Sequence, residues 1–165
     1  MESNFQKVFE FNEAFSVPVS KKLWKDVFTK NPKLTKLRLD LILEEVSELK
    51  EAVENHDMTE TIDALADILY VVYGMGVSFG IDLNKAFDIV HSSNMSKLCT
   101  TEEDAQKTVE LYETSFANGS SPYDTPAYRK SKDGRYWVIY NKSTGKILKN
   151  YKYTPACFAD MLAAR

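Results

Sequence analysis

A chain of 165 residues is long enough for one domain with a sizeable hydrophobic core. Apolar residues make up 44% of it and charged residues 27%, which is ordinary for a soluble globular protein. The net charge of −3 does not favour a general nucleic-acid-binding surface, although a bound metal ion would still attract a small phosphorylated ligand. Two cysteines, Cys99 and Cys157, give neither a disulfide framework nor a CxxC metal signature.

The start of the chain and its longest uncharged run bear on where the protein resides. Residues 1–7 lack the basic start and the apolar run of a signal peptide. The uncharged run 68–81 is too short to span a bilayer and predicts a buried helix. Together with the cysteine usage, these features predict a cytoplasmic protein that has no membrane partner.

Apolar periodicity predicts a series of helices along the first hundred residues. Pro18 ends the first of them, since a proline disfavours helix in the residue before it. Asn31-Pro32 is interpreted as a turn, with Thr35 and Thr59 as the N-caps of the two helices that follow. The predicted helices cover residues 4–15, 21–30, 35–54, 59–79 and 83–97.

The last third of the chain has a mixed pattern. Residues 101–116 predict a helix with a thin apolar face, and residues 117–126 form a turn-rich loop. The aromatic and β-branched run 135–141 and the short run 146–149 predict the two strands of a β-hairpin. Residues 154–161 predict a last short helix.

The predicted helix 35–54 carries an acidic cluster on the side opposite its apolar face. Glu44, Glu45 and Glu48 converge there, because side chains three and four residues apart are neighbours on a helix. Like charges this close repel unless something neutralises them, and on its own the cluster is explained by a solvated surface. The apolar face is predicted to consist of Leu39, Ile42, Leu43, Val46, Leu49 and Val53.

Glu60, Asp63 and Asp67 form a narrow acidic stripe on the predicted helix 59–79, whose other faces are almost entirely apolar. A helix that is apolar all round is buried. A carboxylate within it is costly unless it is paired or binds a metal. Asp67 is therefore interpreted as a metal ligand or as one half of a buried salt bridge. The basic residues considered for that salt bridge are Arg38, Lys36 and Lys97.

Carboxylates that converge from two helices favour a hard cation such as Mg²⁺ or Mn²⁺. His56 and His91 do not follow a glutamate by three residues, so the Glu-x-x-His pairs of di-iron bundles are missing. No Gly-rich phosphate loop is found either, and phosphate binding would fall to the metal and to basic groups such as Lys97. This set of residues suits metal-assisted attack of water on a phosphoanhydride, with a spare carboxylate accepting the proton.

Four segments, in this order, resemble the MazG-like all-α nucleoside triphosphate pyrophosphohydrolases, and above all their phosphoribosyl-ATP pyrophosphohydrolase-like branch. The first contains Glu-Glu-Val-Ser-Glu and the second contains Asp-Ile-Leu-Tyr. A tail with Gly-Lys-Ile-Leu-Lys is also similar to one found in that branch. The resemblance covers roughly residues 5–98 and 143–160, and its segments are 38–49, 63–74, 80–82, 91–97 and 144–155.

The resemblance implies an all-α, MazG-like helical bundle over residues 1–98. Residues 99–165 would form a small C-terminal extension, with a β-hairpin, packed on the same domain. It implies a homodimer or a dimer of dimers, since one subunit leaves apolar surface uncovered. It also implies Mg²⁺-dependent cleavage of a nucleoside triphosphate or deoxynucleoside triphosphate to the monophosphate and pyrophosphate, for house-cleaning or nucleotide-pool control and without a nucleic acid polymer as partner.

The resemblance also assigns roles to individual residues. The acids of the two helices match the metal-binding motifs, and the polar end of the predicted helix 83–97 matches residues that contact phosphate or sugar. Which glutamate is the general base stays open. The candidate catalytic residues are Glu44 and Glu45; the candidate metal ligands are Glu45, Glu48, Glu60, Asp63 and Asp67; the candidate substrate contacts are Arg38, Tyr70, Asn94 and Lys97.

The second acidic motif departs from the family pattern, in which a Glu-x-x-Asp motif would place glutamate where Ala64 stands. Either Asp63 or Glu60 would then complete the site with Asp67, and both alternatives remain open. The altered motif is also compatible with a non-catalytic nucleotide-binding or helix-pairing module of the same fold. The histidine-pathway enzyme is a narrower alternative. The preferred base stays open, as does the role of residues 99–142, which would suit a lid or an oligomer contact.

Overall fold

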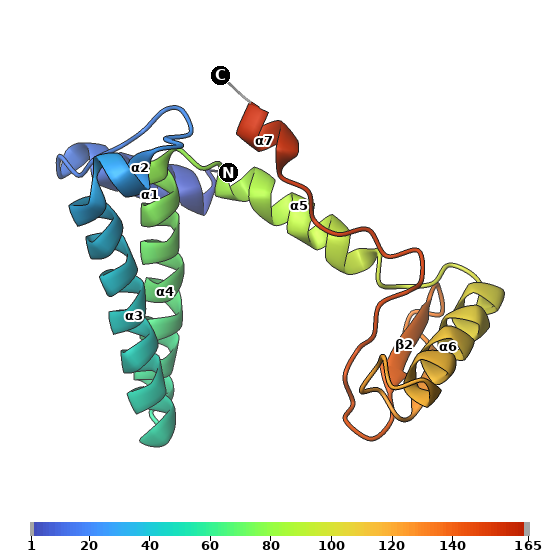
Figure 1. The fold of residues 1–165 in the computed structure, drawn as a ribbon. Helices are drawn as coiled ribbons and strands as arrows, with labels where there is room; N and C mark the ends of the chain where they lie inside the picture. The colour runs from blue at the N-terminus through green and yellow to red at the C-terminus, as the bar shows by residue number, and fades with distance from the viewer. Residues whose placement is uncertain (1, 164–165) are drawn as a thin grey trace. The chain divides into compact units, whose positions relative to one another are not determined.

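The computed structural model describes residues 2–163, and contacts divide the chain into two compact units (Figure 1). The first unit runs to Phe87 and includes the end of the chain from Phe158, and the second runs from Asp88 to Cys157. This division lies within a helix, whereas the sequence predicted a boundary after residue 98 and one shared domain. That domain organisation stays a prediction, and the two units are described separately below.

The predicted fold class is confirmed: the chain is mostly helical, with one small antiparallel sheet late in the sequence. Each predicted helix has a counterpart, although several begin or end elsewhere. The helices are α1 (Asn4–Ala14), α2 (Val27–Lys30), α3 (Pro32–Glu54), α4 (Met58–Phe79), α5 (Leu83–Met95), α6 (Glu102–Ala117) and α7 (Ala159–Ala163), and the strands are β1 (Pro126–Lys130) and β2 (Trp137–Asn141).

Helix α3 begins at Pro32, because Asn31 is its N-cap. The Asn31 side chain accepts a hydrogen bond from the Leu34 N–H at 3.1 Å. A proline is well placed in the first turn of a helix, where its missing N–H costs nothing. The interpretation of Asn31-Pro32 as a turn was therefore wrong, as was Thr35 as the cap.

Helix α4 is fixed at both ends by local chemistry. Asp57, and not Thr59 as predicted, is its N-cap, and its carboxylate accepts from the N–H groups of Thr59 and Glu60 at 2.9 and 3.1 Å. Gly80 ends the helix with φ of 68°, in the left-handed region that glycine favours. A Cβ at Gly80 would lie 1.9 Å from the Lys22 carbonyl oxygen, so the chain passes too close for any other residue.

Helices α3 and α4 lie side by side as a hairpin with a short connection (Figure 1). The residues of α3 that are buried or half-buried against it include Arg38, Glu45 and Ala52, which repeat every two turns. The predicted apolar face of α3 is mostly open in the single chain. Four of its residues, Leu39, Leu43, Val46 and Val53, are 46–57% exposed.

Helix α4 is buried mainly in its C-terminal part, where Gly74 and the residues from Gly76 to Phe79 are covered, and Ala64 is buried as well. Its N-terminal part exposes apolar side chains, so it is not buried all round as predicted. By length and composition α4 would suffice to cross a membrane, with a mean hydropathy of 1.5 over an 18-residue window, and core helices of soluble proteins meet the same criterion. The exposed apolar residues of this part are Met58, Ile62, Leu65 and Leu69.

The second unit has its own hydrophobic core, made by α6 and the sheet. Cys99, Ala105, Ile139 and Leu148 are its buried residues. Strand β2 pairs with β1, with Tyr128 opposite Ile139, whereas residues 146–149 contribute only one bridge. The predicted pairing of residues 135–141 with 146–149 is therefore present as this short bridge. The main partner of β2 is β1, for which no strand was predicted.

The buried Asn141 side chain explains why the loop before β1 is ordered against β2. Its Oδ1 accepts from the Thr125 N–H at 3.0 Å, and its Nδ2 donates to Asp124 at 3.0 Å. Pro126 then begins β1, a position where a strand tolerates proline. Helix α7 begins at Ala159, later than the residue-154 start predicted for the last helix.

Candidate active site

The register of the α3–α4 hairpin brings the two acidic clusters together. The Arg38 guanidinium lies beside Gly74, where an added Cβ would be 3.0 Å from Nη1. Glu45 follows Arg38 by seven residues, and Asp67 precedes Gly74 by seven. Each step is about 10 Å along a helix axis, so Glu45 and Asp67 come to the same level of the hairpin. The packing of α3 against α4 thus accounts for the predicted convergence of the two acidic clusters.

Glu45 is the centre of this acidic region. Its side chain is half-buried, and its Oε2 is fully covered and has no hydrogen-bond partner among the described residues. Burial raises the pKa of the Glu45 carboxyl, and neighbouring negative charges raise it further. Those charges belong to Glu48, Asp67, Glu44 and Asp63, in decreasing order of effect.

The donor set fits a hard cation by its chemistry, because the charged side chains that act on Glu45 are all carboxylates. An unpartnered buried oxygen is also what a cation would stabilise. As the side chains lie, however, no three Asp, Glu, His or Cys residues within 2–163 are placed to hold one ion together. Glu44, Glu48 and Asp63 are exposed, so their carboxylates are free to change rotamer.

Ala64 stands where the family pattern would supply one more carboxylate. This is the position at which the family pattern would have glutamate, and Ala64 is 4% exposed, so it points into the packed side of α4. Asp63 is one residue away, about 100° around the helix, and lies at the exposed surface. Asp63 is among the residues that raise the Glu45 pKa, and Glu60 is not.

The salt bridge considered for Asp67 is not formed. Among the described residues, Asp67 has no ion-pair partner within 4.0 Å. The three basic residues considered for it have other partners: Lys36 pairs with Asp40, Lys97 bonds Asn94, and Arg38 bonds Ser78.

Arg38 is buried, and no carboxylate of residues 2–163 pairs with it. Its Nε donates to Ser78 Oγ at 3.0 Å, and the Ser78 hydroxyl donates to the Pro18 carbonyl at 2.9 Å. Its Nη2 has no partner within the described part of the chain. Burial lowers the pKa of Arg38. The guanidinium therefore ties α3, α4 and the segment after α1 together, about two turns from Glu45.

Tyr70 is partly exposed and meets the ring of Phe11 edge-on at 5.5 Å. It lines an apolar cavity of about 210 Å³ between α1 and α4. Ala66, next to Asp67 in sequence, lines the same cavity. The structure thus places Tyr70 at a hollow formed by α1 and α4.

Asn94 and Lys97 lie in the second unit, at and just beyond the end of α5. The Lys97 ammonium donates to Asn94 Oδ1 at 2.7 Å. The structure therefore places these two predicted substrate-binding residues, Asn94 and Lys97, in contact with each other.

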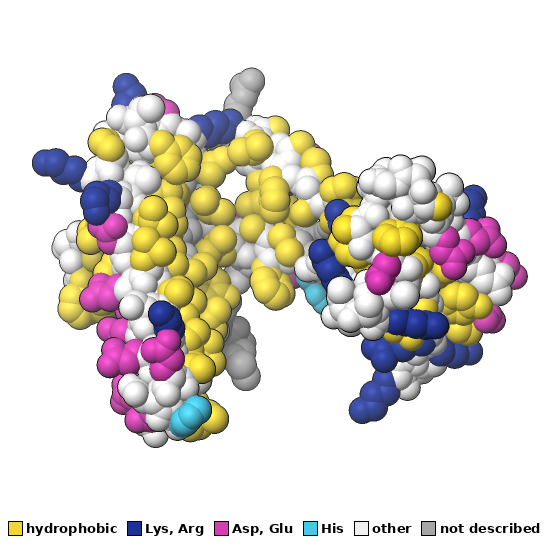
Figure 2. Space-filling model, turned by 60° about the horizontal axis from the view of Figure 1, so that its bottom comes forward, with side chains coloured by type: hydrophobic (Ala, Val, Ile, Leu, Met, Phe, Trp, Pro, Cys, Tyr) yellow, Lys and Arg dark blue, Asp and Glu magenta, His cyan; other side chains and the backbone are white. Residues whose placement is uncertain are grey.

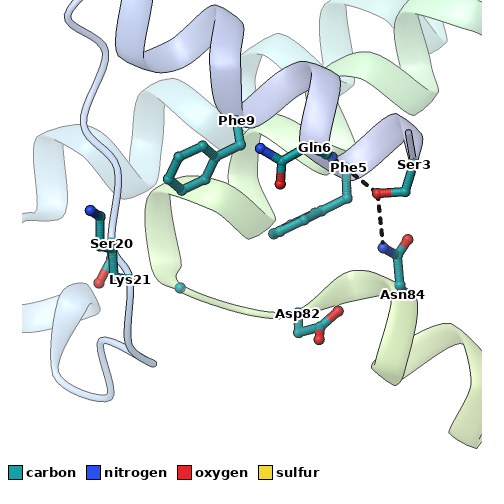
Figure 3. Close-up of a pocket in the computed structure, with 9 residues that line it drawn as sticks. Ser3, Phe5, Gln6, Phe9, Ser20, Lys21, Asp82 and Asn84 are labelled. Atoms are coloured by element: carbon teal, nitrogen blue, oxygen red, sulfur yellow. Dashed lines mark hydrogen bonds between the residues drawn. The ribbon is translucent and has the colours of Figure 1, made fainter. Parts of the chain in front are cut away.

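A larger polar hollow, of about 400 Å³, lies at the other end of α4 (Figure 3). Phe5 and Phe9 of α1 line one part of it, and Asp82 and Asn84 line another. The Asn84 amide donates to the Ser3 hydroxyl at 3.3 Å. No candidate residue of the sequence analysis lies here, because its residues come from three short segments without a shared pattern.

Comparisons with known proteins bear on the identity of this arrangement. A family described as phosphoribosyl-ATP pyrophosphohydrolase matches residues 8–94, more than half of the chain and all of both acidic clusters. The chain is also 31% identical to an uncharacterised protein of Acanthamoeba polyphaga mimivirus, over 97% of this chain and 96% of that protein. The family supports a hydrolase of the pyrophosphohydrolase type. The resemblance found in the sequence is confirmed: this chain belongs to the phosphoribosyl-ATP pyrophosphohydrolase family.

Proposed function

We propose that the protein hydrolyses a nucleoside triphosphate or deoxynucleoside triphosphate between its α and β phosphates and releases pyrophosphate. The observation that carries this proposal is the covered, unpartnered Glu45 oxygen among four other carboxylates. Such a cluster is unfavourable alone and is stabilised by a divalent cation. The family match supports the same class of reaction. House-cleaning or control of a cytoplasmic nucleotide pool would suit this activity.

Glu45, Glu48 and Asp67 would hold Mg²⁺ or Mn²⁺, with Asp63 completing the set. Asp63 is favoured over Glu60 because it lies near enough to raise the Glu45 pKa. A bound Mg²⁺ would polarise the phosphate and lower the pKa of water. Glu44 is exposed beside the cluster and would accept the proton of the attacking water.

The remaining candidates would bind the substrate. Tyr70 and its apolar cavity would receive a planar base, which matches an aromatic-lined hollow. Lys97 would exchange its bond with Asn94 for a phosphate oxygen, and Asn94 would then be free for the sugar. Arg38 would act from its buried position by holding the helices of the site in register.

The test is pyrophosphate release from a panel of nucleoside triphosphates with and without Mg²⁺. Asp67→Asn should lower kcat/KM by about 100-fold or more, since even outer residues of metal sites cost 10–100-fold. Asp40→Asn, an exposed change on the same hairpin, is the matched control and should leave release unchanged. Release that does not need Mg²⁺, or that survives Asp67→Asn, would contradict the proposal.

A second candidate function is a nucleotide-binding module that has lost turnover. The observation that favours it is Ala64, which leaves the ligand set open. Calorimetry separates the two: tight binding of a triphosphate with no pyrophosphate from any nucleotide would support the module. Binding followed by release would support the enzyme.

A further inference from the structure

The second unit carries a strong positive charge that the whole-chain value hides. Residues 126–153 contain eight basic residues, one acidic residue and six aromatic residues. This segment therefore has a net charge of +7 in a chain of net −3. Figure 2 shows Lys and Arg side chains gathered on one part of this unit, away from most of its Asp and Glu.

Few of these basic groups are neutralised by the protein itself. In the described part of the chain, only Arg135 and Lys152 of this segment form salt bridges, with Asp133 and Asp104. Within residues 2–163, the other basic groups of the segment have no carboxylate within 4.0 Å. They are Arg129, Lys130, Lys132, Lys142, Lys146 and Lys149.

The sheet has one covered face and one open face. Side chains alternate across a strand, and Ile139 and Asn141 are buried on the side of α6. Val138 and Tyr140 therefore face the other way, as does Tyr136 just before β2. Across from them on β1 are Ala127 and Arg129. We name these five residues the outer sheet face, and among the described helices and strands only α6 packs broadly on the sheet, from the opposite side.

The outer sheet face combines aromatic rings with cations. Arg129 is exposed, and its guanidinium lies 5.1 Å from the centre of the Tyr140 ring. Tyr136 and Tyr140 are half-buried and four residues apart, about 13 Å along a strand. Lys142 is exposed and follows on the same side beyond β2. The Arg135 guanidinium lies 5.7 Å from the centre of the Tyr136 ring, so each tyrosine has a neighbouring positive charge.

We propose that the outer sheet face, with Lys142, binds single-stranded nucleic acid. Basic groups track the phosphates of a single strand, and aromatic side chains stack its unpaired bases. A sheet face with outward aromatic rings is a known platform for splayed bases. A duplex offers no free base to a tyrosine, so the partner is a single strand. This activity is separate from nucleotide hydrolysis and departs from the expectation based on the whole-chain charge.

Full-length protein is titrated into a fluorescein-labelled oligothymidylate of about 16 nucleotides, the upper end of single-strand site sizes. Fluorescence anisotropy should report binding that weakens with salt. Tyr140→Leu should raise Kd about ten-fold through lost stacking, whereas Tyr140→Phe, which keeps the ring, should bind like the natural chain.

Arg129→Gln with Lys142→Gln tests the charges on two exposed side chains that do not contribute to the core. The double variant should raise Kd for the oligonucleotide. It should also reduce the slope of the logarithm of the binding constant against the logarithm of the salt concentration by roughly 1.4, because each of the two lost phosphate contacts contributes about 0.7 on a single strand. Lys30→Gln with Lys33→Gln, two exposed lysines of the first unit, removes the same charge and should have no such effect.

Several results would overturn the proposal. The first is that the protein does not bind the oligonucleotide at low salt, and the second is that the Lys30 and Lys33 control pair weakens binding as much as the Arg129 and Lys142 pair does. The third is that neither Tyr140→Leu nor the Arg129 and Lys142 pair changes Kd. The fourth is that the protein binds a duplex more tightly than the single strand. Binding to phosphatidylserine vesicles but not to the oligonucleotide would assign the surface to a membrane instead. If the Arg129 and Lys142 pair leaves the Kd for the oligonucleotide unchanged but lowers pyrophosphate release, the surface would be assigned to substrate capture instead.

Discussion

At the scale of single residues, Glu45 links the sequence pattern to the chemistry. The spacing of Glu44, Glu45 and Glu48 predicted their convergence, because neighbours three and four apart are a local property of a helix. Which glutamate is covered was not predictable, since that depends on how α3 turns toward α4. The same holds for Ala64, whose burial becomes visible only after the helices are packed.

Glu45→Gln should stabilise the metal-free protein at neutral pH. Its folded pKa is raised above the ordinary value of 4.5, so the folded state binds the proton more tightly than the unfolded state. The contribution of the Glu45 carboxyl to the free energy of unfolding is therefore fully present below pH 4.5. It is lost as the pH rises through the pKa of the folded state. The gain above that range should be roughly 0.5 kcal/mol, the scale of one relieved like-charge pair.

Urea unfolding with and without Mg²⁺ measures this effect. The gain should vanish below pH 4.5, and Mg²⁺ should stabilise the natural chain more than Glu45→Gln. Glu51→Gln, an exposed change on the same helix, is the control and should show neither effect. A variant that is less stable at neutral pH would show that the Glu45 carboxylate is already compensated within the protein.

Ala64→Glu should close the ligand set. The new carboxylate would replace a buried methyl group on the packed side of α4, so the metal-free variant should lose roughly 1–3 kcal/mol of stability. Added Mg²⁺ should raise its Tm more than that of the natural chain and increase pyrophosphate release. Ala64→Gln has the same size without the charge and should gain nothing from Mg²⁺. Equal Mg²⁺ responses in the two variants would place residue 64 outside the metal site.

At the scale of elements, the helices were predictable and their packing faces were not. Periodicity shows which residues of α3 and α4 are apolar, but in one chain the hairpin buries a different face. Strand β1 was missed because Pro-Ala-Tyr-Arg-Lys has little β-branched character and is ordered by distant contacts to Asn141. Local pattern finds elements, whereas long-range pairing decides their partners.

The end of α4 offers an element-scale prediction. Its C-terminus is bound to the segment before α2, where the Ser20 and Trp24 N–H groups donate to Val77 and Phe79 at 3.0 and 2.8 Å. Gly80→Ala would place a methyl group against this segment and should lower the free energy of unfolding by about 3 kcal/mol or more. That loss exceeds the roughly 1–2 kcal/mol expected for a non-glycine residue in the left-handed conformation alone.

Gly119→Ala is the matched control, because Gly119 has φ of 76° and nothing within 4 Å of an added Cβ. Its cost should be the conformational term alone, roughly 1–2 kcal/mol. Denaturant midpoints of the two variants give the comparison. Similar losses at both positions would show that the segment before α2 yields easily to α4.

At the scale of the whole molecule, the unpaired apolar faces of α3 and α4 need a partner. Both faces belong to one hairpin, and together they exceed the scattered apolar residues normal for a surface. We propose that a second copy of the chain covers them, in a homodimer or a dimer of dimers. This accounts for the apolar periodicity of α3, which the single chain leaves without a function.

Leu43→Lys should disrupt this assembly. Leu43 is 57% exposed in the single chain, and a lysine there would be buried without a counter-charge between two apolar faces. Light scattering should give the natural chain a mass at least twice 18.8 kDa, and the variant a mass near 18.8 kDa. Leu111→Lys, at a similarly exposed leucine of the second unit, should leave the mass unchanged. A natural chain that is monomeric at micromolar concentration and partitions into lipid vesicles would mean that the apolar α4 meets a membrane instead, since its length and composition permit both.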